Sequence, residues 1–344
     1  MKLYPLSVLC CVSTVVVAGI CFAAQAAGNT ATFHQVADVV LPGPSGRFDY
    51  AARDPRSGLL WLNQMGADRL LVFDPQTRRV VGIVHDLSTP TGITLAPQRR
   101  LAFVSNAGGL FARVAGHGSV AVVDLDTRKI LARLPAGHFP DGSAWVPGSG
   151  RLFVSDELGG SETVIGGMPL RAEKTIALGG EAGMSAYDPI DDQVLVNVQT
   201  RDQIVAIDPK TLRIVGRTTL PAACRHNHGL LVDAADRLAF VACDGNARLL
   251  VLSLPQLRPV QAPLALGKDP DVLTLDSAHR RLIVAGEGGV AAVFNIVDRH
   301  LQPLWRGFVG RDAHVVVADP TGRLYFPLAN LHARPALRIV EFQP

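Results

Sequence analysis

Apolar residues in this chain occur in short runs that are broken by turn-forming residues, and no stretch shows a helical period. Seven segments repeat one pattern, in which an apolar strand, a turn rich in Asp, Pro and Gly, and a second apolar strand follow one another. The segments span residues 46–64, 89–106, 139–156, 180–198, 225–243, 268–286 and 311–329. The pattern therefore predicts seven copies of a β-hairpin.

A second hairpin follows most of these segments, clearest in residues 70–84, 120–134 and 204–218. Each reads as strand, D-x-x-T turn and strand, because Asp initiates turns and Thr can bond back to the backbone. Each repeat then supplies four strands in about 40 to 50 residues, which is the period of a propeller blade.

The ends of the chain complete the count. The last repeat stops one strand short, and "FHQVADVVLPG" (residues 33–43) resembles the outer strand of the other repeats. We expect it to fill the last blade and so remove a free sheet edge. The prediction is an all-β, seven-bladed β-propeller that forms a single domain over residues 27–344.

The repeated V-x-D-x-x-T pattern resembles that of the YVTN-repeat, YncE-like seven-bladed propellers of secreted bacterial proteins, over essentially the whole mature chain. The resemblance implies the fold. It leaves the function open, because propellers host binding, electron transfer and several enzymatic chemistries.

Residues 1–26 have the features of a signal peptide: Lys2, an apolar stretch over residues 6–23 and an Ala-x-Ala cleavage site after Ala26. Ile20 before Cys21 argues against a lipoprotein signal. We expect a periplasmic or secreted protein with no membrane span after cleavage. Of the cysteines, only Cys224 and Cys243 remain in the mature chain, and an oxidising compartment favours a disulfide between them. A Cys–His metal site with His226 is the rival interpretation.

Composition and motifs limit the kinds of partner and of enzyme activity to expect. The formal net charge is +3 and no basic run stands out, so nothing indicates nucleic-acid binding. The chain has no G-x-S-x-G, C-x-x-C-H, P-loop or dinucleotide fingerprint, which removes several enzyme classes.

Candidate chemistry comes from aligning the seven repeats at the start of their first strands. The residues at this position are Asp49, Thr91, Asp141, Gly183, His228, Asp271 and His314. First strands surround the channel of a propeller, so these seven residues, the mouth ring, should meet at one channel mouth. Asp49, His228, Asp271 and His314 come from consecutive blades and could bind Zn, Mn or Fe(II), or Ca if carboxylates and water dominate.

Other residues near the ring are candidates for catalysis and for ligand contact. His228, His314 and Asp141 are candidate catalytic groups. Arg47, Phe139 and His226 lie two positions before ring residues and, with Thr91, are candidate substrate contacts. The Gly-rich loop over residues 106–119 could form a lid that carries Arg113 and His117. A metal-free ligand site and a merely solvated channel remain open alternatives.

Two stretches, "GRFDYAARDP" and "FPDGSAWVP", resemble parts of the gluconolactonase/SMP-30-like propellers. That resemblance implies that Asp49 and Asp141 stand where those families place metal ligands. The chain departs from them in having seven blades and in adding His228 and His314, and histidines in a propeller channel resemble those of amidating and streptogramin lyases. The implied function is a metal-dependent lactonase-type hydrolase or lyase. The alternative is a non-catalytic propeller of the cell envelope that binds a small molecule or a protein.

Overall fold

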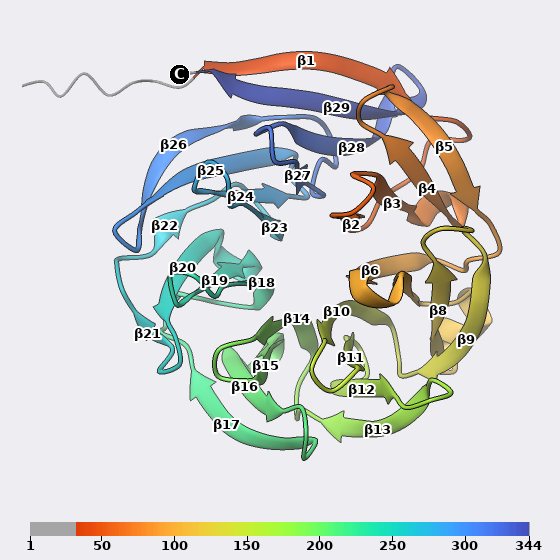
Figure 1. Cartoon of the computed structure of the whole chain (residues 1–344). Helices are drawn as coiled ribbons and strands as arrows, with labels where there is room; N and C mark the ends of the chain where they lie inside the picture. The colour runs from red at the N-terminus through yellow and green to blue at the C-terminus, as the bar shows by residue number, and fades with distance from the viewer. Residues whose placement is uncertain (1–31, 344) are drawn as a thin grey trace, which may run out of the picture.

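The computed structural model describes residues 32–343, so the predicted signal peptide lies outside the described residues. Seven antiparallel sheets stand around a central channel, as Figure 1 shows. The prediction of a seven-bladed β-propeller is confirmed.

Each blade has four main strands in the order of the chain, running from the channel outward, except for the last. Blades one to three comprise β2 (Ala51–Arg53), β3 (Leu60–Gln64), β4 (Arg69–Asp74), β5 (Arg79–Val84); β6 (Pro90–Ala96), β7 (Leu101–Asn106), β8 (Gly118–Asp124), β9 (Ile130–Ala136); and β10 (Pro140–Val146), β11 (Arg151–Asp156), β12 (Ser161–Gly166), β13 (Arg171–Ala177).

Blades four to six follow the same plan, and the outer edge of blade five is split into two short strands. They comprise β14 (Ala182–Asp188), β15 (Gln193–Val198), β16 (Gln203–Asp208), β17 (Arg213–Thr219); β18 (Asn227–Asp233), β19 (Leu238–Cys243), β20 (Arg248–Ser253), β21 (Arg258–Pro259), β22 (Leu264–Ala265); and β23 (Pro270–Asp276), β24 (Arg281–Gly286), β25 (Val290–Val297), β26 (His300–Phe308).

Blade seven joins the two ends of the chain. Its strands are β27 (Val317–Ala318), β28 (Leu324–Leu331), β29 (Arg334–Gln343) and β1 (Thr32–Val40). Strand β1 pairs with β29 from Thr32 opposite Gln343 to Val40 opposite Ala336, and the Asp38 carboxylate binds the Arg338 guanidinium. Closure by the N-terminal strand is thus confirmed.

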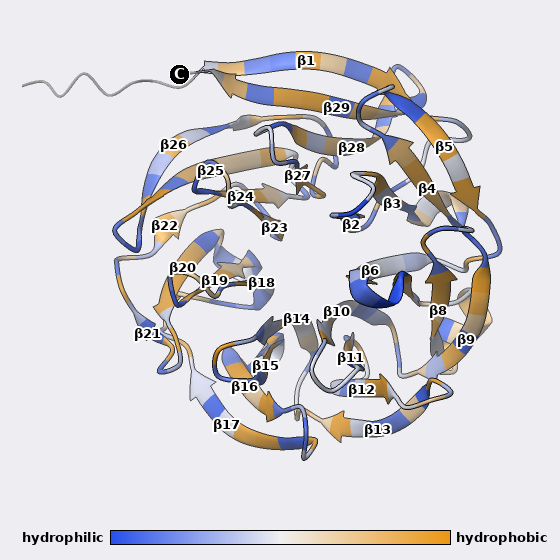
Figure 2. Cartoon of the chain, in the orientation of Figure 1, coloured by the Kyte–Doolittle hydropathy of each residue, from blue (hydrophilic) through white to orange (hydrophobic). Residues whose placement is uncertain are grey.

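Burial explains the two kinds of strand. Every residue of β3 and of β19 is buried, because middle strands are covered on both faces by the neighbouring blades. The outer strand β17 alternates between exposed and half-buried positions, and Figure 2 shows both hydrophilic and hydrophobic segments along it.

The D-x-x-T turns form as expected. The Asp74 carboxylate accepts hydrogen bonds from the Gln76 N–H and the Thr77 hydroxyl, and Asp124 and Asp208 make the corresponding turns in blades two and four. These turns fix the hairpins between the third and fourth strands.

The disulfide is also confirmed: Cys224 and Cys243 are bonded, with their Cα atoms 5.3 Å apart. The lid loop contains a feature that the sequence pattern did not predict, the five-residue helix α1 (Leu110–Val114). Short 3₁₀ turns occur at Met65–Ala67, Pro97–Arg99, Gln199–Arg201 and Asp244–Asn246. In the part of the chain that the structure describes, none of the helices is long and apolar enough to traverse a lipid bilayer.

Candidate functional site

A β-bulge positions the mouth-ring residue in blades two to six. The pairing between first and second strands shifts register between Pro140 and Ser143, around Asp141, and between Pro270 and Leu273, around Asp271. The same shift surrounds Thr91, Gly183 and His228. Because a bulge breaks the strict alternation of a strand, it can turn a side chain toward the channel.

Two glycines next to ring residues let adjacent first strands approach closely. A Cβ atom on Gly92 would lie 1.9 Å from the Asp141 carbonyl oxygen, and one on Gly229 would lie 2.4 Å from the Asp271 carbonyl oxygen. Only glycine fits at such contacts. The T-G and H-G pairs in the sequence are therefore a steric requirement for bringing neighbouring ring residues together.

The ring opens into a cavity of about 460 Å³ at the channel mouth. Seven carboxyl groups line it, against one arginine and two histidines. The charged and titratable lining residues are Asp49, Asp141, Glu157, Asp244, Asp269, Asp271, Glu287, Arg47, His226, His228 and Tyr50. This excess of acidic groups favours a cationic occupant.

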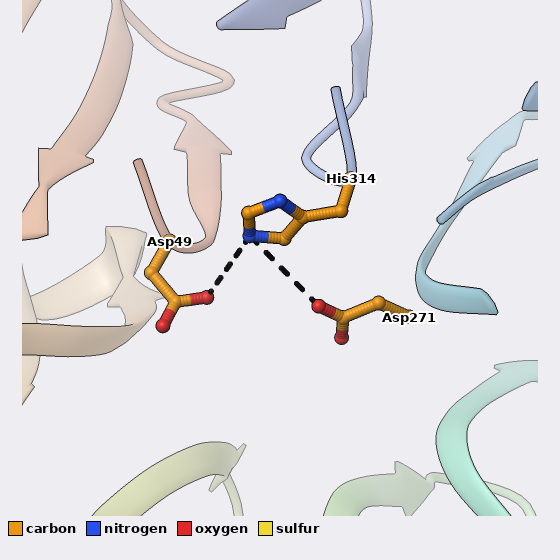
Figure 3. Close-up of side chains that lie close together, drawn as sticks. All are labelled: Asp49, Asp271 and His314. Carbon is orange, nitrogen blue, oxygen red and sulfur yellow. Dashed lines mark ion pairs between the residues drawn. The ribbon is translucent and has the colours of Figure 1, made fainter. Parts of the chain in front are cut away.

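Asp49, Asp271 and His314 point toward one another at the mouth (Figure 3). His314 Nε2 lies 3.6 Å from Asp49 Oδ1 and 3.9 Å from Asp271 Oδ2. One ligand atom from each of the three residues lies within 4.8 Å of the other two, and all three residues are buried. We refer to these three residues as the Asp–Asp–His cluster.

The imidazole of His314 is fixed in orientation. Its Nδ1 lies 3.0 Å from the backbone carbonyl oxygen of Asp312, an acceptor, so Nδ1 carries a proton. Its Nε2 is buried without a hydrogen-bond partner among residues 32–343 and faces the two carboxylates. Burial lowers the pKa of His314, but the Asp49 and Asp271 carboxylates outweigh it, and the pKa is raised. Nε2 therefore requires either a proton or a metal ion between it and the carboxylates.

The cluster fits a divalent metal ion. Ligand atoms about 2.1 Å from a tetrahedral ion lie about 3.4 Å apart, close to the distances from His314 Nε2 to the two carboxylates. One imidazole with two carboxylates suits Zn, Mn or Fe(II) better than Ca, which prefers oxygen ligands alone. A histidine whose other nitrogen donates to a carbonyl is also the usual arrangement at metal sites.

Arg47 is the cation that already faces this cluster. Its guanidinium lies 2.7 Å from Glu287, 3.8 Å from Asp49 and 4.0 Å from Asp271. Burial lowers the pKa of Arg47, but the three carboxylates raise it by more than burial lowers it. The pKa is therefore raised, and the side chain is charged. Arg47 offsets part of the negative charge and lies where a ligand anion could contact it.

His228 is held differently from His314. Its Nε2 lies 3.1 Å from Asp271 Oδ1 and 3.3 Å from the Tyr50 hydroxyl, and its Nδ1 lies 3.1 Å from Gln199 Oε1. Burial opposes the charged form, but the Asp271 carboxylate raises the pKa of His228 to about 10. His228 is therefore an imidazolium at neutral pH. It belongs to the mouth, but its atoms are outside the Asp–Asp–His cluster, so the structure brings three of the four predicted metal ligands together.

Asp141 lies beside the cluster. Burial, together with the nearby Asp49 and Glu157 carboxylates, raises the pKa of Asp141 well above its usual value. The Tyr50 hydroxyl donates to Asp141 Oδ2 at 3.4 Å. A carboxyl group with a raised pKa retains its proton to higher pH, which suits a general acid.

The candidate substrate contacts divide into two groups. Arg47, Phe139 and His226 line the cavity, and the Arg113 guanidinium of α1 stacks 5.5 Å above the Phe139 ring. Thr91 does not line the cavity: it is fully buried, and its hydroxyl donates to the carbonyl oxygens of Ser105 and Pro140. The prediction of Thr91 as a substrate contact is corrected on that ground.

The alignment of the seven repeats did not single out a second set of mouth residues. Each of them lies directly after the second strand of its blade. Glu157, Gln199, Asp244 and Glu287 occupy this position in blades three to six, and all four line the cavity. The backbone N–H of each bonds to the carbonyl oxygen two residues before the ring residue of its own blade. The repeats carried this signal, because the polar residue follows "FVSD", "VNV", "VAC" and "VAG" at one fixed register.

Tyr50 was overlooked as well. It adopts a left-handed backbone conformation with φ 46°, which is unusual for an aromatic residue, and it turns its ring toward the channel. A residue directly after Asp49 would have been expected to point away from the mouth if the strand alternated regularly.

Comparison with known proteins identifies the fold. No protein-family profile matches the chain, and no curated protein matches its sequence. A chain of Kuenenia stuttgartiensis hydrazine synthase is similar in structure, with a TM-score of 0.68 and 14% identity over 88% of this chain and 96% of that one. The WD40 repeats of RRP9 give a TM-score of 0.72 and 10% identity over 91% of this chain and 100% of the other.

These matches place the chain among the β-propellers. At such identities the similarity concerns the fold alone. Membership of the YncE-like propellers stays a prediction.

Proposed function

We propose that the protein is a metal-dependent hydrolase or lyase that acts on a small molecule bound at the channel mouth. The observation that carries this proposal is the buried Nε2 of His314, which has no hydrogen-bond partner in the described part of the chain and faces two carboxylates. Asp49, Asp271 and His314 would hold the ion. A bound divalent ion would polarise a carbonyl group or lower the pKa of a water molecule.

The surrounding side chains have separable roles in this proposal. The His228 imidazolium holds the Asp271 carboxylate in place through the 3.1 Å contact with Oδ1, leaving Oδ2 directed at His314. Asp141 would donate a proton to a leaving group. Arg47, Phe139 and His226 would contact the substrate, with Phe139 as an apolar platform.

We also propose that the mature protein works in the periplasm or outside the cell. The predicted signal peptide over residues 1–26 supports this location, and so does the Cys224–Cys243 disulfide, because disulfides persist in oxidising compartments.

Metal analysis tests the main proposal. Purified protein is loaded with Zn, Mn, Fe(II) or Ca, dialysed, and measured by elemental analysis. We expect one ion per chain in the wild type, loss of that ion in His314→Ala and Asp49→Asn, and retention in the control His279→Ala, whose ring pairs with Asp276 outside the cavity. Wild-type protein that holds no ion and gains no thermal stability from any of the four would overturn the proposal.

One observation favours a second candidate function, a metal-free binding propeller of the cell envelope. Arg47 already places a positive charge within 4.0 Å of both carboxylates of the Asp–Asp–His cluster. If Arg47 is sufficient to neutralise them, Arg47→Ala should allow a metal ion to bind where the wild type binds none. One bound ion per chain in both proteins contradicts this second function.

A further inference from the structure

A second cavity of about 270 Å³ adjoins the mouth cavity inside the channel. The two cavities share Tyr50 and Asp271 as lining residues. The inner cavity, here called the inner compartment, extends along the first strands from the level of the mouth ring.

The lining changes character between the two cavities. Whereas acidic residues are frequent at the mouth, most residues that line the inner compartment are apolar, among them Ile93, Met184, Leu230, Val272, Leu273 and Val316. The polar exceptions are the two shared residues and the side chains of Arg53 and Thr274. A ligand that spans both cavities would meet charge at one end and an apolar wall at the other.

Contacts of the Tyr50 side chain define the boundary between the two cavities. The Tyr50 ring lies at the junction, and its hydroxyl is held by Asp141 on one side and by His228 Nε2 at 3.3 Å on the other. Tyr50 therefore directs its polar atom to the mouth, while the ring belongs to the wall of both cavities.

We propose that the inner compartment binds an unbranched aliphatic group of the ligand whose polar end binds at the mouth. The inference rests on the proposed function in placing that polar end at the Asp–Asp–His cluster. It adds the substrate class: an amphipathic molecule with a short alkyl or acyl chain next to its reacting group. The inner compartment is continuous with the mouth cavity, and most of the residues that line it are apolar.

A chain-length series tests this inference. Metal-loaded protein is titrated by calorimetry with n-alkyl hydroxamates from acetohydroxamate to octanohydroxamate, whose head group binds metal ions. Each buried methylene should tighten binding about fourfold until the compartment is full. A parallel series of n-alkylammonium ions with metal-free protein uses the seven mouth carboxyl groups instead of the metal.

Valine-to-threonine variants locate the effect without changing side-chain shape. Val272→Thr and Val316→Thr each add a hydroxyl at a residue that lines the inner compartment, and should reduce the gain in affinity per methylene. Val232→Thr is the matched control, because Val232 packs partly buried in blade five and does not line the compartment. Circular dichroism and thermal unfolding confirm that each variant is folded.

The outcomes separate this inference from the proposed function. Stoichiometric metal with a flat chain-length series, or with no binding of either series, overturns the inference and leaves the metal centre standing. Absence of metal with a rising alkylammonium series overturns the proposed function and supports the compartment. A third outcome is that affinity still rises with alkyl-chain length to the same extent in Val272→Thr, Val316→Thr and Val232→Thr. In that case the alkyl group binds elsewhere, and the inference is overturned.

Discussion

Glu162 shows how a buried carboxyl group behaves away from the channel mouth. It lies between blades three and four, where Ser185 donates to its Oε1 at 2.7 Å and Ser155 approaches its Oε2 at 3.4 Å. No cation among residues 32–343 neutralises it, and burial raises its pKa well above 4.5. Glu162 is therefore protonated in the folded protein over a pH range in which the unfolded chain ionises it.

This gives a pH-dependent prediction for Glu162→Gln. Glu162 stabilises the fold fully below its unfolded pKa of about 4.5, and this contribution is lost as the pH rises toward the raised folded pKa. The neutral Gln has no such loss. Thermal unfolding should show little difference between variant and wild type at pH 4 and a growing advantage of the variant up to pH 8. A constant difference across this range would contradict the raised pKa.

Thr91 provides a prediction about a ring residue that is fully buried and does not line the cavity. Its hydroxyl bonds to two buried carbonyl oxygens, so Thr91→Val should lower the free energy of unfolding by about 1 kcal/mol, as measured by denaturant titration. Metal content and hydroxamate affinity should stay at wild-type levels. If instead ligand affinity falls while stability is unchanged, Thr91 is a ligand contact after all.

At the scale of the element, the disulfide connects the loop before β18 to the end of β19. Cys224 and Cys243 are both fully buried, and the bridge closes a loop with a sequence separation of 19. Such a loop contributes about 3 kcal/mol through the restricted unfolded chain.

We expect Cys224→Ala/Cys243→Ala to lose about 3 kcal/mol of unfolding free energy in denaturant titrations. Wild-type protein under strong reductant is the matched control, because it opens the same loop without truncating side chains. A reduced wild type as stable as the oxidised one would show that the bridge contributes nothing to stability.

Single elements also mark how far the sequence could predict the structure. The D-x-x-T turns, the strand pairs and the missing outer strand of blade seven follow from local patterns, and each is present. The bulges at the mouth ring do not follow from such patterns, because pairing shifts depend on the approach of the next blade, as at Gly92 against Asp141. The ring register located Asp49, Asp271 and His314, but it could not give the rotation of His228 toward Asp271 or the turn at Tyr50.

At the scale of the whole molecule, ring closure depends on β1. Without it, β29 would present unpaired backbone groups along an open edge, which is a template for association. Deleting residues 1–41 should lower the thermal midpoint and produce dimers or larger species in size-exclusion chromatography with light scattering. Deleting residues 1–31 is the control, since it retains β1. Equal midpoints and monomeric behaviour for both would contradict a structural role for the closure.

The excess of acidic groups at the mouth is also a property of the assembled ring. The formal net charge of the whole chain is +3, and no single repeat is unusually acidic, yet seven carboxyl groups meet around one cavity. Composition could not reveal this, because the seven groups come from four different blades: three from blade six, two from blade three and one each from blades one and five. The ring of blades brings together carboxyl groups that lie far apart in the sequence.

The position of the Asp–Asp–His cluster relative to the closure has a consequence for the life of the protein. Asp49 belongs to the first blade that the ribosome makes and His314 to the last, and they meet only where the chain joins itself. A metal ion bound by both residues would link the first blade to the last. A truncated or misassembled chain would lack this link and any chemistry that depends on the ion. Activity would then be confined to complete molecules.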